Sequence, residues 1–421
     1  MTRAAHETAP ALRIWTPAQS AVVVSGVLLL LSELLVPSAA GPFPGHGERF
    51  AAMAADPFTF EGPFPQRLLW PLGAWCFSHL GMSALTFSHL CTGVLLAVVF
   101  WFAHQRTRSS LDAALVATAA AASGAALVYN TMTCMSDQLS LASLFLLVHF
   151  AGRRWVFWPL VLVSALAHEL VFFFWPWLLY LRCQNGGVWW RDGLCLGAAM
   201  AAYLLFRSQV TASYGASYYL ENAFWFPWCM PVMWTLWGFE VLVEFGPLLA
   251  LVAWGLGRDG ALSARGALGG RFGPALFLCG VLPLMVLAYD VMRFATFAVL
   301  PVVLAGVSLV QRRGGRAALS GLIAASVLCY AWLHPVASEQ GGRHFTDIAA
   351  HILSLLPTRV VPTQPMAPEH AWTFTAALVE RWWWPVGACA FVGALVVIAV
   401  GRALRRLDAS TPPRASSPSA E

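Results

Sequence analysis

Ionisable residues stand at a few places inside otherwise apolar stretches of this 421-residue chain, and they are the residues that could do chemistry. The adjacent His168 and Glu169 lie between Ala165-Leu-Ala and Leu-Val-Phe-Phe-Phe-Trp. In a membrane each ionisable group costs about 2.5–3.5 kcal/mol, so it needs a partner or a function. We expect this pair either to clamp two helices together or to act as catalytic or ligand-orienting groups.

Two further sets of polar residues allow a structural and a functional interpretation. Asp137 begins an apolar run, so that it or Ser136 either caps a helix or faces a cavity beside Asn130. Asp290 and Arg293 are three residues apart and would share a helix face. They form either an internal salt bridge or a site where Arg293 offers its bidentate fork to a phosphate.

A fourth set follows the first apolar run. Glu48 to Ala55 reads as a short amphipathic helix that Asp56 ends, because the residue before a proline avoids the helical conformation. Glu48 and Asp56 would then approach one cavity, and Arg67 would snorkel or bind an anion. The alternative is an ordinary helix at the membrane interface.

The composition sets the class of protein. The chain is 59% hydrophobic and 11% charged, with a mean hydropathy of +0.67, whereas a soluble protein carries about 25% charged residues. A soluble enzyme, nucleic-acid binding and intrinsic disorder are therefore excluded. The fold class we predict is all-α, a polytopic integral membrane protein with the lipid bilayer as partner.

Cysteine and histidine usage indicates no structural metal. The nine cysteines form no CxxC pair and no Cys/His cluster, so neither a disulfide framework nor a zinc site is supported. No cofactor is required by the sequence, and the carboxylates leave room for a divalent cation.

Apolar runs long enough to cross the bilayer as helices predict about ten to twelve membrane segments. The stretch 155–181 is too long for one span and holds His168-Glu169 in its middle, so we predict a hairpin of two short helices, 155–167 and 168–181. The other predicted spans are 18–37, 83–103, 111–130, 137–151, 193–208, 230–256, 273–289, 294–311, 317–334 and 383–402.

The arginines predict the orientation, since all 25 basic residues are arginine. With a cytoplasmic N-terminus and the hairpin, 18 arginines fall inside and 7 outside. A single span at 155–181 would invert everything after it and place Arg312, Arg313 and Arg316 outside. We therefore expect a multi-pass protein of the bacterial inner membrane with both termini cytoplasmic.

This topology predicts one transmembrane domain, residues 1–407, and a disordered cytoplasmic tail, 408–421. The long loops 38–66 and 335–382 would lie outside. Ser38-Ala39-Ala40 resembles a signal-peptidase site, but Glu33 and the 17-residue lead favour a retained first helix.

The order of these motifs resembles that of the GT-C class of membrane glycosyltransferases over residues 18–310. The likeness is carried by an acidic first external loop with a short helix and by four later motifs. These are Arg67-Leu-Leu-Trp-Pro-Leu72, Ser136-Asp137-Gln138, His168-Glu169 and Asp290-x-x-Arg293.

The resemblance implies an enzyme that moves a sugar from a polyprenyl-phosphate donor to a lipid, glycan or protein acceptor at the extracytoplasmic face. By position, Glu48 would be the general base and Asp56 a supporting acid. The usual acidic pair directly after the first span is missing here. The residues implied in substrate binding are Arg67, Asp137, His168, Glu169, Asp290 and Arg293.

Two other classes of function stay open. A transporter or lipid flippase would use Glu33, Glu169, Asp290 and Arg293 as charges along a path, but such proteins are built from related halves and no internal repeat is visible. In a non-catalytic membrane subunit, each polar pair would be a packing clamp.

Overall fold

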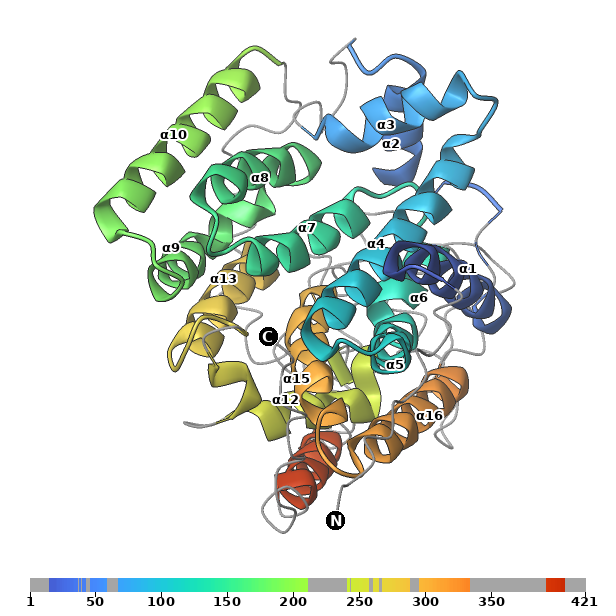
Figure 1. Cartoon of the computed structure of the whole chain (residues 1–421). Helices are drawn as coiled ribbons and strands as arrows, with labels where there is room; N and C mark the ends of the chain where they lie inside the picture. The colour runs from blue at the N-terminus through green and yellow to red at the C-terminus, as the bar shows by residue number, and fades with distance from the viewer. Residues whose placement is uncertain are drawn as a thin grey trace, which may run out of the picture.

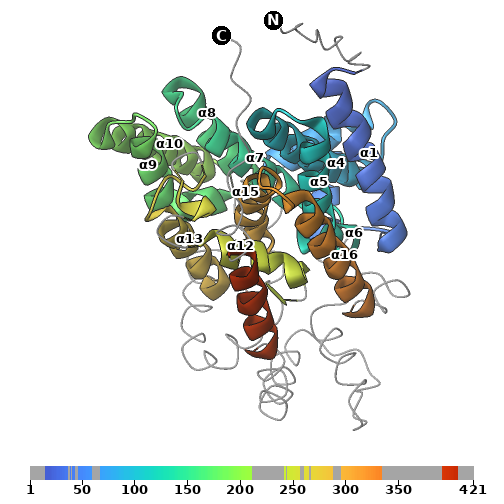
Figure 2. The ribbon, with the colours of Figure 1, turned by 60° about the horizontal axis from the view of Figure 1, so that its bottom comes forward.

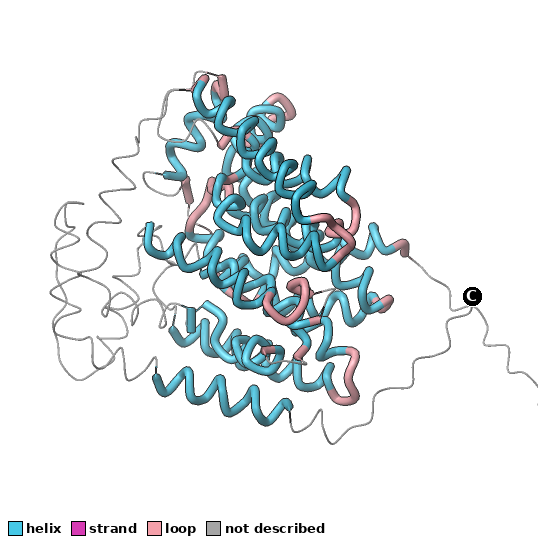
Figure 3. The backbone as a smooth tube through the Cα atoms, turned by 90° about the vertical axis from the view of Figure 1, so that its left-hand side faces the viewer, coloured by secondary structure: helices cyan, strands magenta, loops and turns pink. Residues whose placement is uncertain are grey.

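Helices joined by loops and turns make up the residues that the computed structural model describes (Figures 1 and 3). No strand occurs in this part of the chain, in agreement with the predicted all-α fold. The described part does not include Asp290, Arg293, the loop 335–382 or the tail 408–421, and what is expected of them stays a prediction. The described residues are 15–36, 38, 40–42, 46–58, 67–210, 241–242, 244–256, 260–264, 267–287, 295–333 and 391–405.

Two helices are long and apolar enough to cross a membrane. The first, α1 (Pro17–Leu35), begins with a capping box in which Thr16 and Gln19 bond each other's backbone N–H groups. The second, α4 (Ala84–Thr107), is the longest helix described.

A third candidate span is bent. Helices α5 (Ser110–Ala121) and α6 (Gly124–Thr131) meet at an angle of 53° and would count together as one broken span. By length and composition the described residues thus supply two or three candidate spans, against the ten to twelve segments expected from the sequence.

The remaining predicted segments are mostly helical, and apart from α10 (20 residues) and α16 (19 residues) their helices are short. Apolar helices of 10–17 residues occupy most of them. The bounds are α7 (Asp137–His149), α10 (Trp189–Ser208), η2 (Gly246–Leu248), α12 (Leu249–Gly255), η3 (Ala261–Ser263), α13 (Gly273–Leu287), η4 (Thr296–Ala298), α15 (Val299–Val310), α16 (Gly315–Leu333) and the helical residues 391–405.

Helix α4 lies at the centre of one half of the molecule. It packs against α1, α5 and α7, and α8, α9 and α10 gather on the side away from α1 (Figure 2). Phe100 and Phe102 of α4 are fully buried, and Phe102 meets Phe145 of α7 edge to face with 5.3 Å between ring centroids. These aromatic contacts fix α7, which carries Asp137, against α4.

The predicted hairpin is present. Helix α8 (Arg154–Ala167) ends at His168, a 3-10 turn η1 (Glu169–Phe174) follows, and α9 (Trp175–Gln184) begins with Pro176 in its first turn. The end of α9 lies beside the start of α8, as shown by the Arg182 guanidinium, which donates to the carbonyl of Ala151. The break predicted between residues 167 and 168 is confirmed.

A buried hub holds the two ends of this hairpin together. The Asp192 carboxylate of α10 accepts from Arg182 Nε at 3.1 Å and from the Trp158 indole at 2.8 Å. Its other oxygen accepts from the Val188 amide at 2.9 Å. Helices α8, α9 and α10 are therefore joined around one ion pair.

Two short helices follow α1, of which the first-loop pattern predicted the first. Helix α2 (His46–Ala55) ends one residue before Asp56, and α3 (Leu69–Ser78) packs against it. Phe50 meets Trp70 edge to face with 6.0 Å between ring centroids, and Trp70 meets Phe87 of α4 at 5.5 Å. The predicted helix 48–55 is confirmed, and it is anchored to α4 through Trp70.

Candidate functional site

Arg67 and Glu169 form a buried, two-pronged ion pair. Arg67 Nε donates to Glu169 Oε2 at 2.9 Å and Nη2 to Oε1 at 2.8 Å. Arg67 lies just before α3, whereas Glu169 opens η1, and both side chains are buried. This fork-to-fork geometry is the strongest form of such a pair. It ties the segment between α2 and α3 to the broken helix.

His168 lies between two carboxylates. Its Nδ1 is 3.5 Å from Glu169 Oε2, and its Nε2 is 3.7 Å from Asp137 Oδ1. The backbone at His168 is extended (φ −161°), and its amide donates to the carbonyl of Ser164. Because the helix stops here, the imidazole is turned toward α7 instead of continuing the surface of α8.

The Ser136 side chain does not cap α7. Ser136, the residue before α7, has helical dihedral angles and makes no capping hydrogen bond with its side chain. The Asp137 carboxylate is buried and lies next to His168. The structure thus excludes a cap by the Ser136 side chain and places the Asp137 carboxylate against another polar side chain.

Four of the sequence-predicted residues therefore meet: Arg67, Asp137, His168 and Glu169. We call them the buried cluster. They come from the segment before α3, the first turn of α7 and the break between α8 and η1. With one guanidinium, two carboxylates and one imidazole, this cluster can donate and accept hydrogen bonds in several directions.

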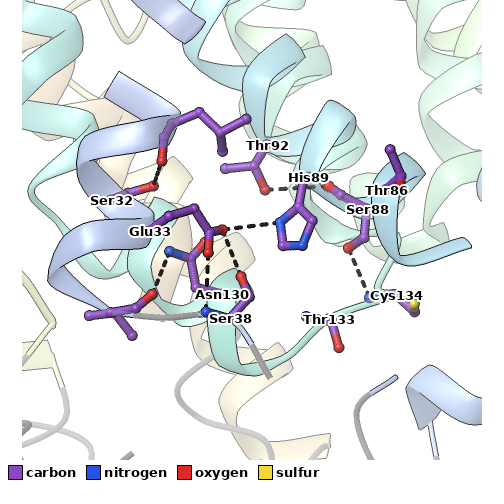
Figure 4. A network of polar contacts seen from close by, with 12 residues as sticks. Ser32, Glu33, Ser38, Thr86, Ser88, His89, Thr92, Asn130, Thr133 and Cys134 are labelled. Carbon is purple, nitrogen blue, oxygen red and sulfur yellow. Dashed lines mark hydrogen bonds and ion pairs between the residues drawn. The ribbon is translucent and has the colours of Figure 1, made fainter. Parts of the chain in front are cut away.

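A second polar group lies at the end of α1, and of its members only Glu33 was named from the sequence, as a charge along a transport path (Figure 4). Glu33 Oε1 is 3.2 Å from His89 Nδ1 of α4. Ser38 donates its hydroxyl to Glu33 Oε1 at 2.6 Å and its amide to Oε2 at 3.1 Å. We call Glu33, Ser38 and His89 the α1–α4 group. Two ionisable residues in neighbouring apolar runs were the only signal for it in the sequence.

The end of α6 and the connection to α7 run between the two groups and bond residues next to the α1–α4 group. Asn130 donates to the carbonyl of Val36 at 3.0 Å, and Thr133 donates to that of Gly41. The Cys134 amide donates to Ser88 Oγ at 2.8 Å (Figure 4). Cys134 adopts a positive φ of 62°, which non-glycine residues seldom do. Three residues after Cys134, the chain reaches the buried cluster at Asp137.

The two carboxylates assigned to catalysis by the resemblance lie on α2 and at its end. Glu48 and Asp56 are exposed. Asp56 Oδ1 accepts from the Phe58 amide at 3.1 Å, so this carboxylate shapes the turn that follows α2. Glu48 lies in the first turn of α2, where the helix dipole stabilises a carboxylate.

Across the described residues, no group of three or more His, Cys, Asp or Glu side chains has an arrangement that could hold a metal ion. Comparisons with protein-family models, with curated proteins and with solved structures found no match. The function has to be argued from the residues themselves.

Proposed function

We propose that this chain is a multi-pass protein of the bacterial inner membrane with residues 1–407 as one transmembrane domain. The surface of α1 supports this, because Val22, Val27, Leu30 and Leu34 are all exposed. Large exposed apolar surfaces mark contact with a membrane or a partner. The short apolar helices would complete the ten to twelve segments together with parts of the chain that the structure does not describe.

The hairpin supports the proposed orientation. Arg182 donates to Ala151, so the arginines before α8 and at the end of α9 belong to one end of the bundle. The predicted excess of arginines on the cytoplasmic side requires this hairpin to begin and end on the same side of the membrane. Both termini are then cytoplasmic, and residues 38–66 and 335–382 are extracytoplasmic.

Labelling of single cysteines tests this topology. In a cysteine-free background, a cysteine introduced at Ala52 or at Thr363 is expected to react with a membrane-impermeant maleimide in intact spheroplasts. A cysteine at Gly314, in the turn before α16, is expected to react only after permeabilisation. Labelling of Gly314→Cys in intact spheroplasts would invert the proposed map.

For the activity, we infer a glycosyltransferase that moves a sugar from a polyprenyl-phosphate donor to a lipid, glycan or protein acceptor at the extracytoplasmic face. The observation that supports it is the meeting of Arg67, Asp137, His168 and Glu169 in one buried cluster. Such a cluster is costly in an apolar protein unless its members are paired or used. These four are among the six residues that the GT-C resemblance assigns to substrate binding.

The charges of the cluster suggest which part of the substrate it holds. Arg67 is engaged by Glu169, and Asp137 adds a second carboxylate, so a phosphate would bring a third negative charge to one guanidinium. Sugar hydroxyls donate to carboxylates and accept from guanidinium and imidazole N–H groups. We therefore assign the buried cluster to the sugar and leave the phosphate to Arg293.

Two carboxylates are candidates for the general base. The resemblance selects Glu48. The contacts favour Glu33, because His89 lies beside it and Ser38 fixes its orientation with two hydrogen bonds. A carboxylate held in this way is positioned to take a proton from an acceptor hydroxyl directly or through the imidazole.

The test is transfer of a labelled sugar from polyprenyl-phosphate donors in proteoliposomes that contain the purified protein. We expect labelled product with one donor class and none when the protein is omitted. A folded, membrane-inserted protein that transfers no sugar from any donor would instead be the non-catalytic subunit in which each pair is a clamp.

A further inference from the structure

The end of the hairpin where α8 and α10 begin carries three exposed tryptophans. Trp155 is 87% exposed, Trp189 75% and Trp190 48%. A fully exposed indole is unfavourable in water, and its amphipathic ring is at home at the boundary between lipid and water. These three rings therefore point to an interface with something other than bulk solvent.

The fold brings the two segments that carry these rings to one end of the bundle. Arg182 holds the carbonyl of Ala151, four residues before Trp155, and also holds Asp192, two residues after Trp190. The Val188 amide, next to Trp189, donates to the same carboxylate. Both tryptophan-bearing segments are thus fastened to a single buried ion pair.

The charge at this end is positive. Arg153 and Arg191 are exposed, and the Arg191 guanidinium carbon lies 5.0 Å from the centre of the Trp190 ring. Asp192 is the one acidic residue in the segments 151–158 and 185–192, and it is buried and bonded to Arg182. The surface consequently presents guanidinium groups and indoles without an exposed carboxylate from these segments.

We propose that Arg153, Trp155, Trp189, Trp190 and Arg191 form a docking surface for the headgroups of anionic phospholipids; we call it the Trp–Arg surface. Tryptophans gather at headgroup level, and arginines there attract anionic lipids. Charge complementarity thus selects an anionic leaflet over a neutral one. This inference rests on the proposed membrane location and not on sugar transfer.

Thermal stabilisation by added lipid tests the proposal. In neutral detergent, phosphatidylglycerol is expected to raise the melting temperature of the full-length protein more than phosphatidylcholine does. Each arginine near an anionic surface contributes about fivefold in affinity. The half-saturating phosphatidylglycerol concentration should therefore rise about 25-fold in the Arg153→Gln/Arg191→Gln variant.

Three controls make the result specific. Arg153→Lys/Arg191→Lys keeps the charge and should keep the preference. Arg207→Gln changes an arginine in the last turn of α10, at the other end of the helix, and should leave the titration unchanged. Trp155→Ala/Trp189→Ala should reduce stabilisation, whereas Trp175→Ala, an exposed tryptophan at the start of α9, should not.

Equal stabilisation by both lipids, or an unchanged titration in Arg153→Gln/Arg191→Gln, would overturn the proposal. Equal stabilisation by inorganic phosphate would also overturn it, since the surface would then bind free anions. Membrane fractionation separates this from the proposed location: a chain that partitions into the soluble fraction contradicts the location, whereas a membrane-bound chain without lipid preference contradicts the Trp–Arg surface alone.

Discussion

Arg67→Gln is expected to lower the stability of the folded protein by about 3–5 kcal/mol, because it leaves the Glu169 carboxylate buried without its partner. Glu169→Gln should lower the stability by a similar amount, because it takes the Glu169 carboxylate away from the buried Arg67 guanidinium. The double variant Arg67→Gln/Glu169→Gln removes both charges and should be clearly milder than either single variant. Thermal unfolding in detergent, read by intrinsic fluorescence, measures all three.

The ion pair between Arg316 and Asp112 supplies a matched control. Arg316 Nε donates to Asp112 Oδ1 at 2.5 Å, and Nη2 donates to Oδ2 at 3.1 Å, so the geometry is again two-pronged. The Asp112 side chain is only 8% exposed, but that of Arg316 is 44% exposed, so water screens this pair from the arginine side, whereas both partners are buried in the pair of Arg67 with Glu169. Arg316→Gln should therefore be much milder than Arg67→Gln. Equal losses at the two pairs would show that burial does not set the cost of breaking them.

Glu33→Gln is expected to lower the rate of sugar transfer by about 10²–10⁴, the usual contribution of a general base. The amide keeps the size of the side chain and can still accept from Ser38, but it cannot take up a proton. Glu48→Gln is the matched control and should retain most of the activity. Initial rates in proteoliposomes at saturating donor measure both effects.

Reversal of this result would restore the assignment made from the resemblance. If Glu48→Gln abolishes transfer and Glu33→Gln does not, the base lies on α2, and the α1–α4 group serves to hold the chain after α1 in place. Melting temperatures of both variants must be close to that of the parent protein for the comparison to stand.

Local features of the site were predictable because short stretches of sequence determine them. Asp56-Pro57 ends α2, and the excess length of 155–181 together with His168-Glu169 predicted a hairpin broken at residue 168. Both depend on neighbours within a few residues, such as the proline after Asp56. All the elements described are helices, as the apolar runs indicated.

The partners of the polar residues could not be predicted in the same way. Arg67 and Glu169 are 102 residues apart, and the contact between Glu33 and His89 joins two different helices. The sequence showed that each charge needed a partner but not which one. The Ser136 side chain does not form the cap proposed at Ser136 or Asp137, and no local pattern reveals the contact of the Asp137 carboxylate with His168.

The hub at Asp192 also has a consequence for the order in which the chain folds. Arg182 reaches back 31 residues to Ala151 and forward 10 residues to Asp192, whereas the pair of Arg67 with Glu169 closes a loop of 102. Short loops close at lower entropic cost and sooner. Helices α8 to α10 should therefore assemble first as a local unit, and the N-terminal helices should then dock against it. In refolding followed by hydrogen exchange, amides of α8 and α9 should gain protection before those of α3.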